Sequence, residues 1–400
     1  MIKYLISLEE LMRMNYKNIN KYLIKTPENL IRTFNDQISS IKDLLYFNIG
    51  EPDFPTPSNV KQVAIQSIED DQSFYAHSRG VLELREAVSR YLKRKYQLNY
   101  SAEDQIFITA GATQALYIAI QGILNEGEEV LVVDPNYVIY NSQIIAAGGS
   151  VVAIDVSDTH FKLTPEKLLD HMTSKTKGLI LNHPTNPTGA TYSADELKAI
   201  ADIANENQLY IISDEVYSEF SYTHPHTSIA AFAPDLTLLI NGASKSHAMT
   251  GWRSAFLAGP SELMDLLYPL HQAILTTITT QVQYASIEAY DHSDEAIHEM
   301  YQSYLERRNL LIAGLDQLAY DYVFPEGAFY LFCKVPDWYK SDDYQFCLDL
   351  AHEVQVALTP GQIFGAAGKG YFRISYVSSL DNLKELLSRL ASFEAYYKVQ

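Results

Sequence analysis

Between about residues 105 and 260, short and almost continuously apolar runs alternate with stretches of helical pattern, which limits the chain to few folds. Strands that are apolar throughout are covered on both faces, as in a mainly parallel sheet between helices. The sequence therefore predicts an α/β fold whose chemistry gathers at the carboxyl ends of the strands. Seven strands are expected: QIFITAG (105–111), EEVLVVDP (128–135), SVVAIDV (150–156), KGLILNHP (177–184), LYIISD (209–214), TLLINGA (237–243) and SAFLAGP (254–260).

Small and capping residues mark the helices of this region. One helix is expected to begin just after Gly111, and another to stop at Gly148-Gly149. The segment Ser193-Ala-Asp-Glu196 has the spacing of a capping box, so a helix is expected from there to about Asn207.

After about residue 290 the pattern changes. A long polar helical stretch (298–318) leads into the apolar run 327–335, a helix after Ser341, a second apolar run and a final helix (380–397). This order predicts a smaller α+β domain, joined by the N-terminal segment. We expect a large domain over residues 48–290 and a small domain formed by residues 1–47 and 291–400.

Composition narrows the classes of partner. The formal net charge of −19 argues against nucleic acid or an anionic membrane surface as partner, and no apolar run approaches the roughly 20 residues that span a bilayer. Two cysteines, Cys333 and Cys347, lack metal-like or redox-like spacing, which favours a reducing compartment. No signal peptide is expected, so the predicted location is cytoplasmic. Met12 and Met14 are alternatives to Met1 as the start.

The segment SKSHAMTGWR, from Ser244 to Arg253, is the strongest chemical signal. It follows the predicted strand 237–243, so Lys245 is expected at a carboxyl end, where a rigidly held neutral amine can form a Schiff base. Arg253 can return to the same pocket and bind a phosphate bidentately. The alternative is a solvated loop with an incidental lysine and arginine.

Two further strand ends point to the same edge. Asp214 ends the predicted strand 209–214, although an aspartate there can also be a helix N-cap. Gly111-Ala112-Thr113 lies where a strand gives way to a helix, so the N–H groups of the first turn can bind an anion. Small residues at such junctions also serve packing alone.

Together these segments resemble the class I aminotransferases, which bind pyridoxal phosphate (PLP) in the fold type I architecture. SKxxxMTGWR resembles their PLP-lysine motif, and other motifs of the family occur in the family's order from about residue 30 to 395. These motifs are Ile49-Gly50-Glu51-Pro52-Asp53-Phe54, Tyr75 with residues 80–86, Asn186-Pro187-Thr188-Gly189, Ser213-Asp214-Glu215-Val216-Tyr217 and Tyr371-Phe372-Arg373-Ile374-Ser375.

The resemblance implies how PLP is held. Lys245 would carry it as a Schiff base, and Asp214 would keep the pyridine nitrogen protonated so that the ring accepts electrons. Tyr217 and Asn186 would contact the phenolic oxygen, and Tyr137 would stack on the pyridine face. The phosphate would be bound by Gly111, Ala112, Thr113, Ser244 and Arg253, with Tyr75 reaching it from the neighbouring subunit of a homodimer with shared active sites.

One position departs from the family pattern. The family often has a phosphate-binding serine three residues before the lysine, where this chain has Gly242, and Ser244 would partly replace it. From the residues alone, Asn186 also fits a plain turn in NPTG, Tyr137 a core aromatic and Tyr75 a structural loop residue.

For the substrate, the resemblance implies that Arg373 binds the α-carboxylate, because its planar guanidinium matches a carboxylate better than lysine would. Asn186 would take part in this binding, and Gly50 would lie beside the carboxylate, where a side chain would obstruct closure. A strand-end turn explains Gly50 equally well locally. No metal ligand is predicted.

The implied activity is transamination between amino acids and 2-oxo acids. The substrate amine would displace Lys245, which then acts as general base and acid, so ping-pong kinetics are expected. Segments 218–230 and 241–253 look most like bacterial aromatic amino acid aminotransferases, with 2-oxoglutarate as acceptor, and almost equally like N-acetyl-diaminopimelate aminotransferases. Aspartate is less favoured, because Thr113 stands where one aspartate-specific subgroup has lysine.

Two other classes are weaker alternatives. A PLP-dependent C–S lyase would share the fold and the lysine, but its usual lysine context lacks MTGWR. A regulator with an aminotransferase-like domain would need an added DNA-binding domain, for which the roughly 30 residues before the matched region are too few.

Overall fold

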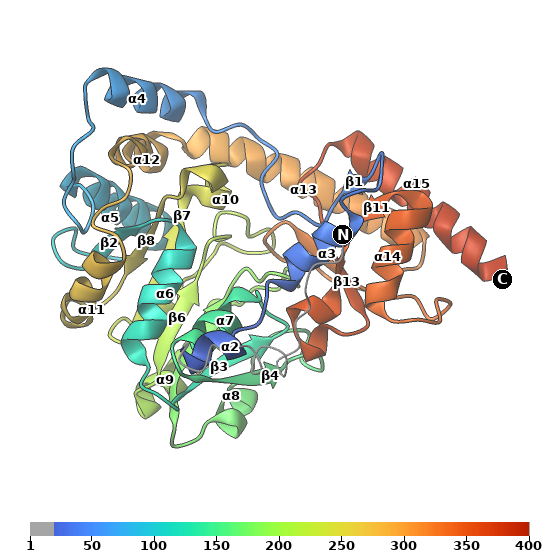
Figure 1. The fold of residues 1–400 in the computed structure, drawn as a ribbon, viewed down its shortest axis with the longest axis horizontal. Coiled ribbons are helices and arrows are strands. Elements are labelled where there is room, and N and C mark those ends of the chain that lie inside the picture. The colour runs from blue at the N-terminus through green and yellow to red at the C-terminus, as the bar shows by residue number, and fades with distance from the viewer. Residues whose placement is uncertain (1–19, 400) are drawn as a thin grey trace.

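The computed structural model describes residues 20–399, and its centre is a seven-stranded sheet (Figure 1). Strand β8 runs antiparallel to both neighbours, while the other strands share one direction, so the predicted mainly parallel α/β sheet is confirmed. In spatial order the strands are β2 (Ile106–Thr109), β8 (Ala255–Ala258), β7 (Thr237–Gly242), β6 (Tyr210–Asp214), β5 (Thr176–Asn182), β3 (Glu129–Asp134) and β4 (Ser150–Asp155).

Alternate side chains of the central strands enter two separate cores. On β3, Leu131 and Val133 pack in a cluster with residues of α8 (Pro165–His171) and α9 (Ala194–Asn207). Val130 and Val132 pack on the other face with α6 (Ala112–Ile123), α7 (Ile139–Ala146) and α11 (Ser261–Ile274). Because helices cover both faces, these strands carry apolar residues at nearly every position.

The predicted capping box is present at the start of α9. The Ser193 hydroxyl accepts a hydrogen bond from the Glu196 N–H at 3.3 Å, and the Glu196 carboxylate accepts one from the Ser193 N–H at 2.7 Å. These two bonds satisfy N–H groups that a helix start leaves without partners, and α9 ends at Asn207 as predicted.

A second, antiparallel sheet of four short strands lies beside the large one, in the order β12 (Thr359–Pro360), β13 (Tyr371–Ser375), β10 (Tyr330–Lys334) and β9 (Tyr322–Val323). The long helix α13 (Asp294–Gln317) leads into it, as Figure 1 shows. Helices α14 (Asp343–Val354) and α15 (Leu380–Val399) pack against each other, which completes the predicted α+β arrangement.

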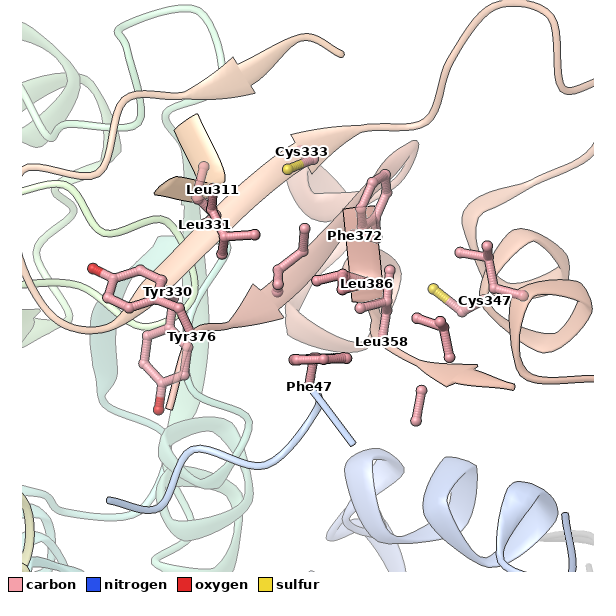
Figure 2. Packing of buried hydrophobic residues seen from close by; sticks show 14 of the residues in the cluster. Phe47, Leu311, Tyr330, Leu331, Cys333, Cys347, Leu358, Phe372, Tyr376 and Leu386 are labelled. Atoms are coloured by element: carbon pink, nitrogen blue, oxygen red, sulfur yellow. The ribbon is translucent and has the colours of Figure 1, made fainter. Parts of the chain in front are cut away.

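Both ends of the described chain share one hydrophobic core (Figure 2). Phe47 lies in a cluster with Phe372, and β1 (Leu45–Tyr46) pairs with β11 (Val356–Ala357). We propose from these contacts the domain division 48–290 against 1–47 with 291–400. Residues 1–19, with the alternative starts, lie outside the described residues.

The remaining helices frame these layers. Helix α12 (Thr280–His292) packs against α4 (Ser58–Glu69) and α5 (Leu82–Tyr96) beside the β2 edge of the sheet, whereas α3 (Leu30–Ile38) packs against α14. Within residues 20–399, no helix is long and apolar enough to cross a membrane. The short helices α2 (Lys21–Lys25) and α10 (Ala243–Ser246) complete the α-helices of residues 20–399.

Candidate active site

A cavity of about 330 Å³ opens at the carboxyl ends of β5, β6 and β7, the edge where a parallel sheet places its chemistry. Residues of α3 and β13 also line it, so segments far apart in the sequence enclose one space. Most of the predicted site residues line this cavity: Gly50, Ala112, Thr113, Tyr137, Asn186, Asp214, Tyr217, Ser244, Lys245, Arg253 and Arg373.

Lys245 lies on α10, a single helical turn directly after β7, and its Nζ donates a hydrogen bond to the Gly50 carbonyl at 2.7 Å. Desolvation, helped by Arg373 and Arg253, outweighs the attraction of nearby carboxylates and lowers the pKa of Lys245 to about 8. An appreciable fraction of its amine is therefore neutral near pH 7.5, as a nucleophile and proton acceptor must be.

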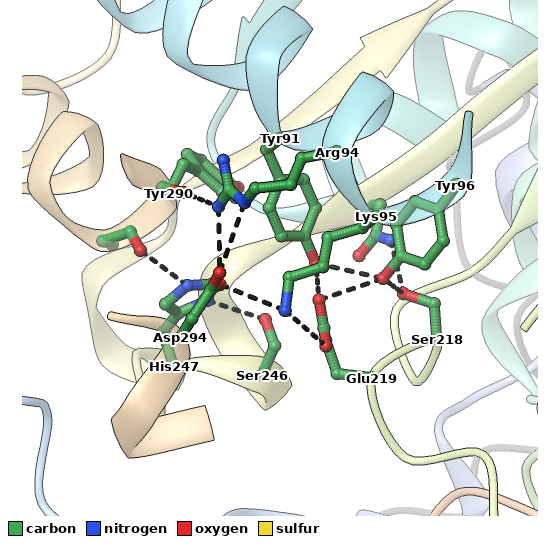
Figure 3. A network of polar contacts seen from close by, with 12 residues as sticks. Tyr91, Arg94, Lys95, Tyr96, Ser218, Glu219, Ser246, His247, Tyr290 and Asp294 are labelled. Atoms are coloured by element: carbon green, nitrogen blue, oxygen red, sulfur yellow. Dashed lines mark hydrogen bonds and ion pairs between the residues drawn. The ribbon is translucent and has the colours of Figure 1, made fainter. Parts of the chain in front are cut away.

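The residues after Lys245 anchor its turn (Figure 3). Ser246 Oγ and His247 Nδ1 lie 2.7 Å apart, and His247 Nε2 contacts the Ala289 carbonyl of α12 at 2.9 Å. Burial lowers the pKa of His247 to about 4, so this ring is neutral at pH 7. Ser246 and His247 lie beside Glu219, whose carboxylate accepts hydrogen bonds from the hydroxyls of Tyr91 and Tyr96. The lysine is thus presented on a buried, hydrogen-bonded support.

Asp214 is the last residue of β6 and is 4% exposed. A turn follows it, so the N-cap reading is wrong. Its Oδ2 accepts a hydrogen bond from the Tyr140 hydroxyl at 2.7 Å. Burial, together with the neighbouring Glu215, raises the pKa of Asp214 to about 6, although the Tyr140 hydrogen bond and Lys245 oppose the rise. At pH 7 the carboxylate is therefore mostly ionised inside the cavity.

The end of strand β5 fixes the backbone of Asp214. The Asp214 carbonyl accepts hydrogen bonds from the Asn182 side-chain amide at 2.8 Å and from the His183 N–H at 3.2 Å. Asn182 Oδ1 in turn accepts one from the Asn186 N–H at 2.9 Å. The ends of β5 and β6 and the NPTG segment therefore form one rigid unit, which is more than a surface turn.

Arg253 lies against the start of α6. Its Nη1 donates to the Thr250 carbonyl at 2.9 Å. A Cβ at Gly111, whose φ is +81°, would lie 2.3 Å from Arg253 Nη2, so a side chain at this position would displace the guanidinium. The position of the arginine beside the first N–H groups of α6 suits an anion such as phosphate.

The departure at Gly242 has a steric reason. A Cβ there would lie 2.6 Å from the Cβ of Ala255 on the adjacent strand β8, so a serine does not fit without a shift of the backbone. Ser244 lines the cavity two residues further on.

Arg373 is buried at the other end of the cavity. Its guanidinium donates to Asn186 Oδ1 and to the Asn48 carbonyl, each at 2.7 Å, and lies 4.4 Å from the Tyr330 ring centroid. Among the described residues, Arg373 Nε and Asn48 Oδ1 have no hydrogen-bond partner. The unpartnered Nε leaves the Arg373 guanidinium with a donor that a carboxylate can accept from.

Tyr330 organises two predicted residues. Its hydroxyl lies 2.9 Å from the hydroxyl of Tyr217, and a Cβ at Gly50 would lie 2.0 Å from it. Glycine at position 50 is therefore required by the tyrosine already present. Burial raises the pKa of Tyr217, so its hydroxyl keeps its proton as a donor.

Two predicted residues lie outside the lining. Gly111 is adjacent to it through its contact with Arg253. Tyr75 does not line the cavity; its side chain is 87% exposed, next to Phe74 at 82%. Two neighbouring aromatic side chains exposed to this extent form an apolar patch on the surface.

Several residues that shape the cavity were not predicted. Tyr140 and Tyr330 lie within apolar or helical runs, where an aromatic is normally read as core. Asn48 precedes a predicted motif, and Ile31 and Asn35 belong to α3, for which no helix was predicted.

These groups fit PLP. Asp214 suits a cationic ring nitrogen, Lys245 suits a carbonyl carbon, and Arg253 with the start of α6 suits a phosphate. Fold and site together define an α/β enzyme of the PLP-binding class.

Comparison with known proteins gives the family. The family model "Aminotransferase class I and II" matches residues 42–390, and the chain belongs to this family, which uses PLP and transfers amino groups. A Bacillus subtilis protein named "Probable N-acetyl-LL-diaminopimelate aminotransferase" is 38% identical over 91% of this chain and 92% of its own length. Aromatic-amino-acid aminotransferase 2 of Thermococcus litoralis is 37% identical over 90% and 94%. The Thermus thermophilus aspartate aminotransferase structure with maleate superposes with a TM-score of 0.89 at 34% identity, covering 94% and 99%.

Proposed function

We propose that this aminotransferase takes an aromatic amino acid as donor and 2-oxoglutarate as acceptor, with PLP bound through Lys245. One observation carries the choice of donor. The cations that line the cavity are Lys245, Arg253 and Arg373, and each has a task toward the cofactor or the α-carboxylate. Among residues 20–399, no fourth cation lines the cavity to neutralise an acidic donor side chain.

The remaining wall is neutral. Ile31 offers apolar surface to a donor ring, whereas Asn35 and Thr113 offer an amide and a hydroxyl. Uncharged side chains such as these can donate hydrogen bonds to the distal carboxylate of 2-oxoglutarate. They do not select a carboxylate over an aromatic ring as strongly as a buried arginine would. Such a wall accommodates both half-reactions.

Bound PLP supplies an electrophilic carbonyl carbon and an electron-accepting ring. Lys245 Nζ, with its lowered pKa, accepts the proton from the substrate Cα and returns it. Asp214 holds the proton of the cofactor's ring nitrogen, and the Tyr217 hydroxyl and Asn186 amide donate to its phenolic oxygen. Gly111, Ala112, Thr113, Ser244 and Arg253 hold the phosphate.

Arg373 orients the substrate. Its guanidinium binds the α-carboxylate, with Asn186 fixing one edge and Tyr330 supporting the face. Gly50, whose carbonyl accepts from Lys245, leaves room for that carboxylate.

A homodimer completes the proposal. The exposed Tyr75 would enter the partner's site and reach the phosphate there, and its neighbour Phe74 would be buried in the interface. We place the enzyme in the cytoplasm, a location that suits two buried cysteines, Cys333 and Cys347, that form no disulfide.

N-acetyl-diaminopimelate transamination is the second candidate, supported by the 38% identity to the Bacillus subtilis relative of that name. Donor-resolved half-reactions separate the candidates. PLP absorbance would be followed as phenylalanine, tyrosine, aspartate and N-acetyl-diaminopimelate are added singly to the purified enzyme, with Lys245→Ala as control. Conversion by the aromatic donors supports the proposal. Conversion by aspartate or the diaminopimelate derivative alone contradicts the choice of donor, and absence of PLP binding contradicts the cofactor site.

A further inference from the structure

Two asparagines from different segments form a hydrogen-bonded pair in the wall of the cavity. Asn35 belongs to α3, and Asn48 follows β1 by two residues. Asn48 Nδ2 donates to Asn35 Oδ1 at 2.7 Å, and both residues line the cavity. Asn48 is 1% exposed, whereas Asn35 is partly exposed. Asn35 is therefore the member of the pair that a ligand can reach.

This hydrogen bond decides which atom Asn35 offers to a ligand. Because its Oδ1 accepts from Asn48, its Nδ2 amide, which can only donate, is left for a ligand, and it makes no hydrogen bond within residues 20–399. If both amides were turned round, Asn48 Nδ2 would be buried without a partner. In the structure Asn48 Oδ1 has none, and a buried carbonyl oxygen tolerates this better than a buried N–H group. Asn35 thus presents a hydrogen-bond donor.

Both asparagines stand on anchored backbone. The side chain of Phe47, directly before Asn48, lies in the hydrophobic core shared by the two chain ends (Figure 2), and its carbonyl accepts a hydrogen bond from the Ser375 N–H at 2.7 Å. Phe34, directly before Asn35, is 0% exposed in the same core. The amide of Asn35 is therefore held in place before a ligand binds, which limits the entropy that binding costs.

Asn48 also contacts the arginine at the end of the cavity. Its backbone carbonyl accepts hydrogen bonds from Arg373 Nη2 at 2.7 Å and from Thr359 Oγ1 at 3.3 Å. Only the carbonyl and side chain of Asn48 separate the Arg373 guanidinium from the Asn35 amide. 2-Oxoglutarate carries its two carboxylates at the ends of a short carbon chain, so these two groups are spaced for a dicarboxylate of this kind.

We propose that Asn35, positioned by Asn48, recognises the distal carboxylate of 2-oxoglutarate and so determines specificity for the acceptor. This inference rests on the proposed function, in which 2-oxoglutarate is the acceptor. Asn35 Nδ2 donates to the distal carboxylate while Arg373 binds the α-carboxylate. A neutral amide also suits a cavity that takes two kinds of substrate. When an aromatic ring occupies this space, no buried charge loses its partner, as the charge of an arginine would.

Binding of two unreactive acids to the PLP-loaded enzyme, measured by titration calorimetry, tests the assignment. Glutarate has the carbon chain and both carboxylates of 2-oxoglutarate, whereas 3-phenylpropanoate has one carboxylate and a ring. Asn35→Leu keeps the size of the side chain and removes the donor. The dissociation constant of glutarate should rise about tenfold, as for one lost hydrogen bond to a charged group, and that of 3-phenylpropanoate should change less than about twofold. Asn35→Asp can still accept from Asn48 but adds a like charge, so it should weaken glutarate binding further.

Asn48→Leu tests the positioning role. It should weaken glutarate binding relative to 3-phenylpropanoate, and in the double variant with Asn35→Leu this ratio should equal that of Asn35→Leu alone, because Asn48 acts through Asn35. Two exposed residues of α3 outside the cavity lining give the controls. Asp36→Leu makes a matched change beside Asn35, and Arg32→Leu removes the cation of this helix. Both controls should leave both dissociation constants unchanged, and thermal unfolding checks that each variant folds.

The proposal is overturned if the unmodified enzyme does not bind glutarate, or if Asn35→Leu leaves glutarate binding unchanged or weakens both acids equally. A loss in Arg32→Leu as large as that in Asn35→Leu also overturns it, because the arginine would then bind the distal carboxylate. If Asn48→Leu does not fold, the two variants of Asn35 decide alone. If glutarate binding depends on Asn35 but the enzyme does not transaminate 2-oxoglutarate, the proposed function fails while the carboxylate site stands.

Discussion

Tyr140→Phe removes one hydroxyl and leaves the ring in the core beside β6. In the structure that hydroxyl donates to Asp214 Oδ2 at 2.7 Å, and both groups are buried. A hydrogen bond to a charged group contributes about 1.5–3 kcal/mol, which corresponds to about a ten- to hundredfold change in an equilibrium. Because this bond is present before PLP binds, its loss acts through the protonation of Asp214, and we expect PLP to bind about two- to fifteenfold more weakly to the variant at pH 7.

The effect depends on pH with a definite sign. The pKa of Asp214 is already raised to about 6, and loss of the Tyr140 donor raises it further. A larger fraction of the carboxyl is then protonated near neutrality, and a protonated carboxyl cannot pair with a cationic ring nitrogen. The loss of affinity should therefore be larger at pH 6 than at pH 8.5.

The assay is titration of the apoenzyme with PLP, followed by absorbance at several pH values. Tyr137→Phe is the matched control, because it removes the hydroxyl of a tyrosine just before α7, and within residues 20–399 that hydroxyl makes no hydrogen bond to Asp214. Equal losses in both variants, or an affinity of Tyr140→Phe equal to that of the unmodified enzyme, would refute the assignment of Tyr140 as the group that keeps Asp214 ionised.

Three further changes test other parts of the site. Arg373→Lys should raise KM for the donor about ten- to hundredfold, because one bidentate contact is lost, and leave PLP affinity unchanged; steady-state kinetics and PLP titration measure both. Asp214→Asn should stabilise the apoprotein by about 3 kcal/mol at pH 7.5. The pKa of the Asp214 carboxyl rises from 3.8 to about 6 on folding, so above pH 6 the folded protein holds a carboxylate that would ionise more easily in the unfolded chain, and the amide removes this cost. Urea unfolding should show this gain in the free energy of unfolding at pH 7.5 and little of it at pH 4. Thr113→Lys should raise kcat/KM for aspartate relative to phenylalanine about tenfold, because it places a cation in the neutral wall; competing half-reactions measure the ratio.

The strands were predictable from sequence because their burial is two-sided. A run such as 177–184 has few positions free for polar residues, so composition alone indicated the strand, and the Ser193 capping box fixed the next helix. The short strands β1 and β11 were not predictable. Each pairs over two residues that lie more than 300 positions apart in the sequence, and a pairing of that length has no local signal.

Site residues could be predicted where a contact restricts the residue type at a backbone position. Gly111 and Gly50 are required by contacts with Arg253 and Tyr330, and such requirements leave a motif in the sequence. Tyr140 leaves none, because a buried tyrosine in an apolar helix is the expected core residue until β6 brings Asp214 to its hydroxyl. Hydrogen bonds that join distant segments through ordinary core residues are visible only in three dimensions.

The choice of amino acid substrate depends on the part of the cavity wall for which the sequence has the weakest motif. Relatives of similar identity carry different substrate names, whereas the proposed roles of the lysine, the aspartate and both arginines concern the cofactor or the α-carboxylate, which are the same for every donor. Discrimination therefore falls to the wall formed by Ile31 and Asn35 of α3 with Thr113. A carboxylate against this wall, that of 2-oxoglutarate included, would have hydrogen bonds from Asn35 and Thr113 but no counter-charge, whereas an aromatic ring would be stabilised by burial. This neutral wall is the basis of the proposed aromatic donor, even though none of its residues takes part in the chemistry.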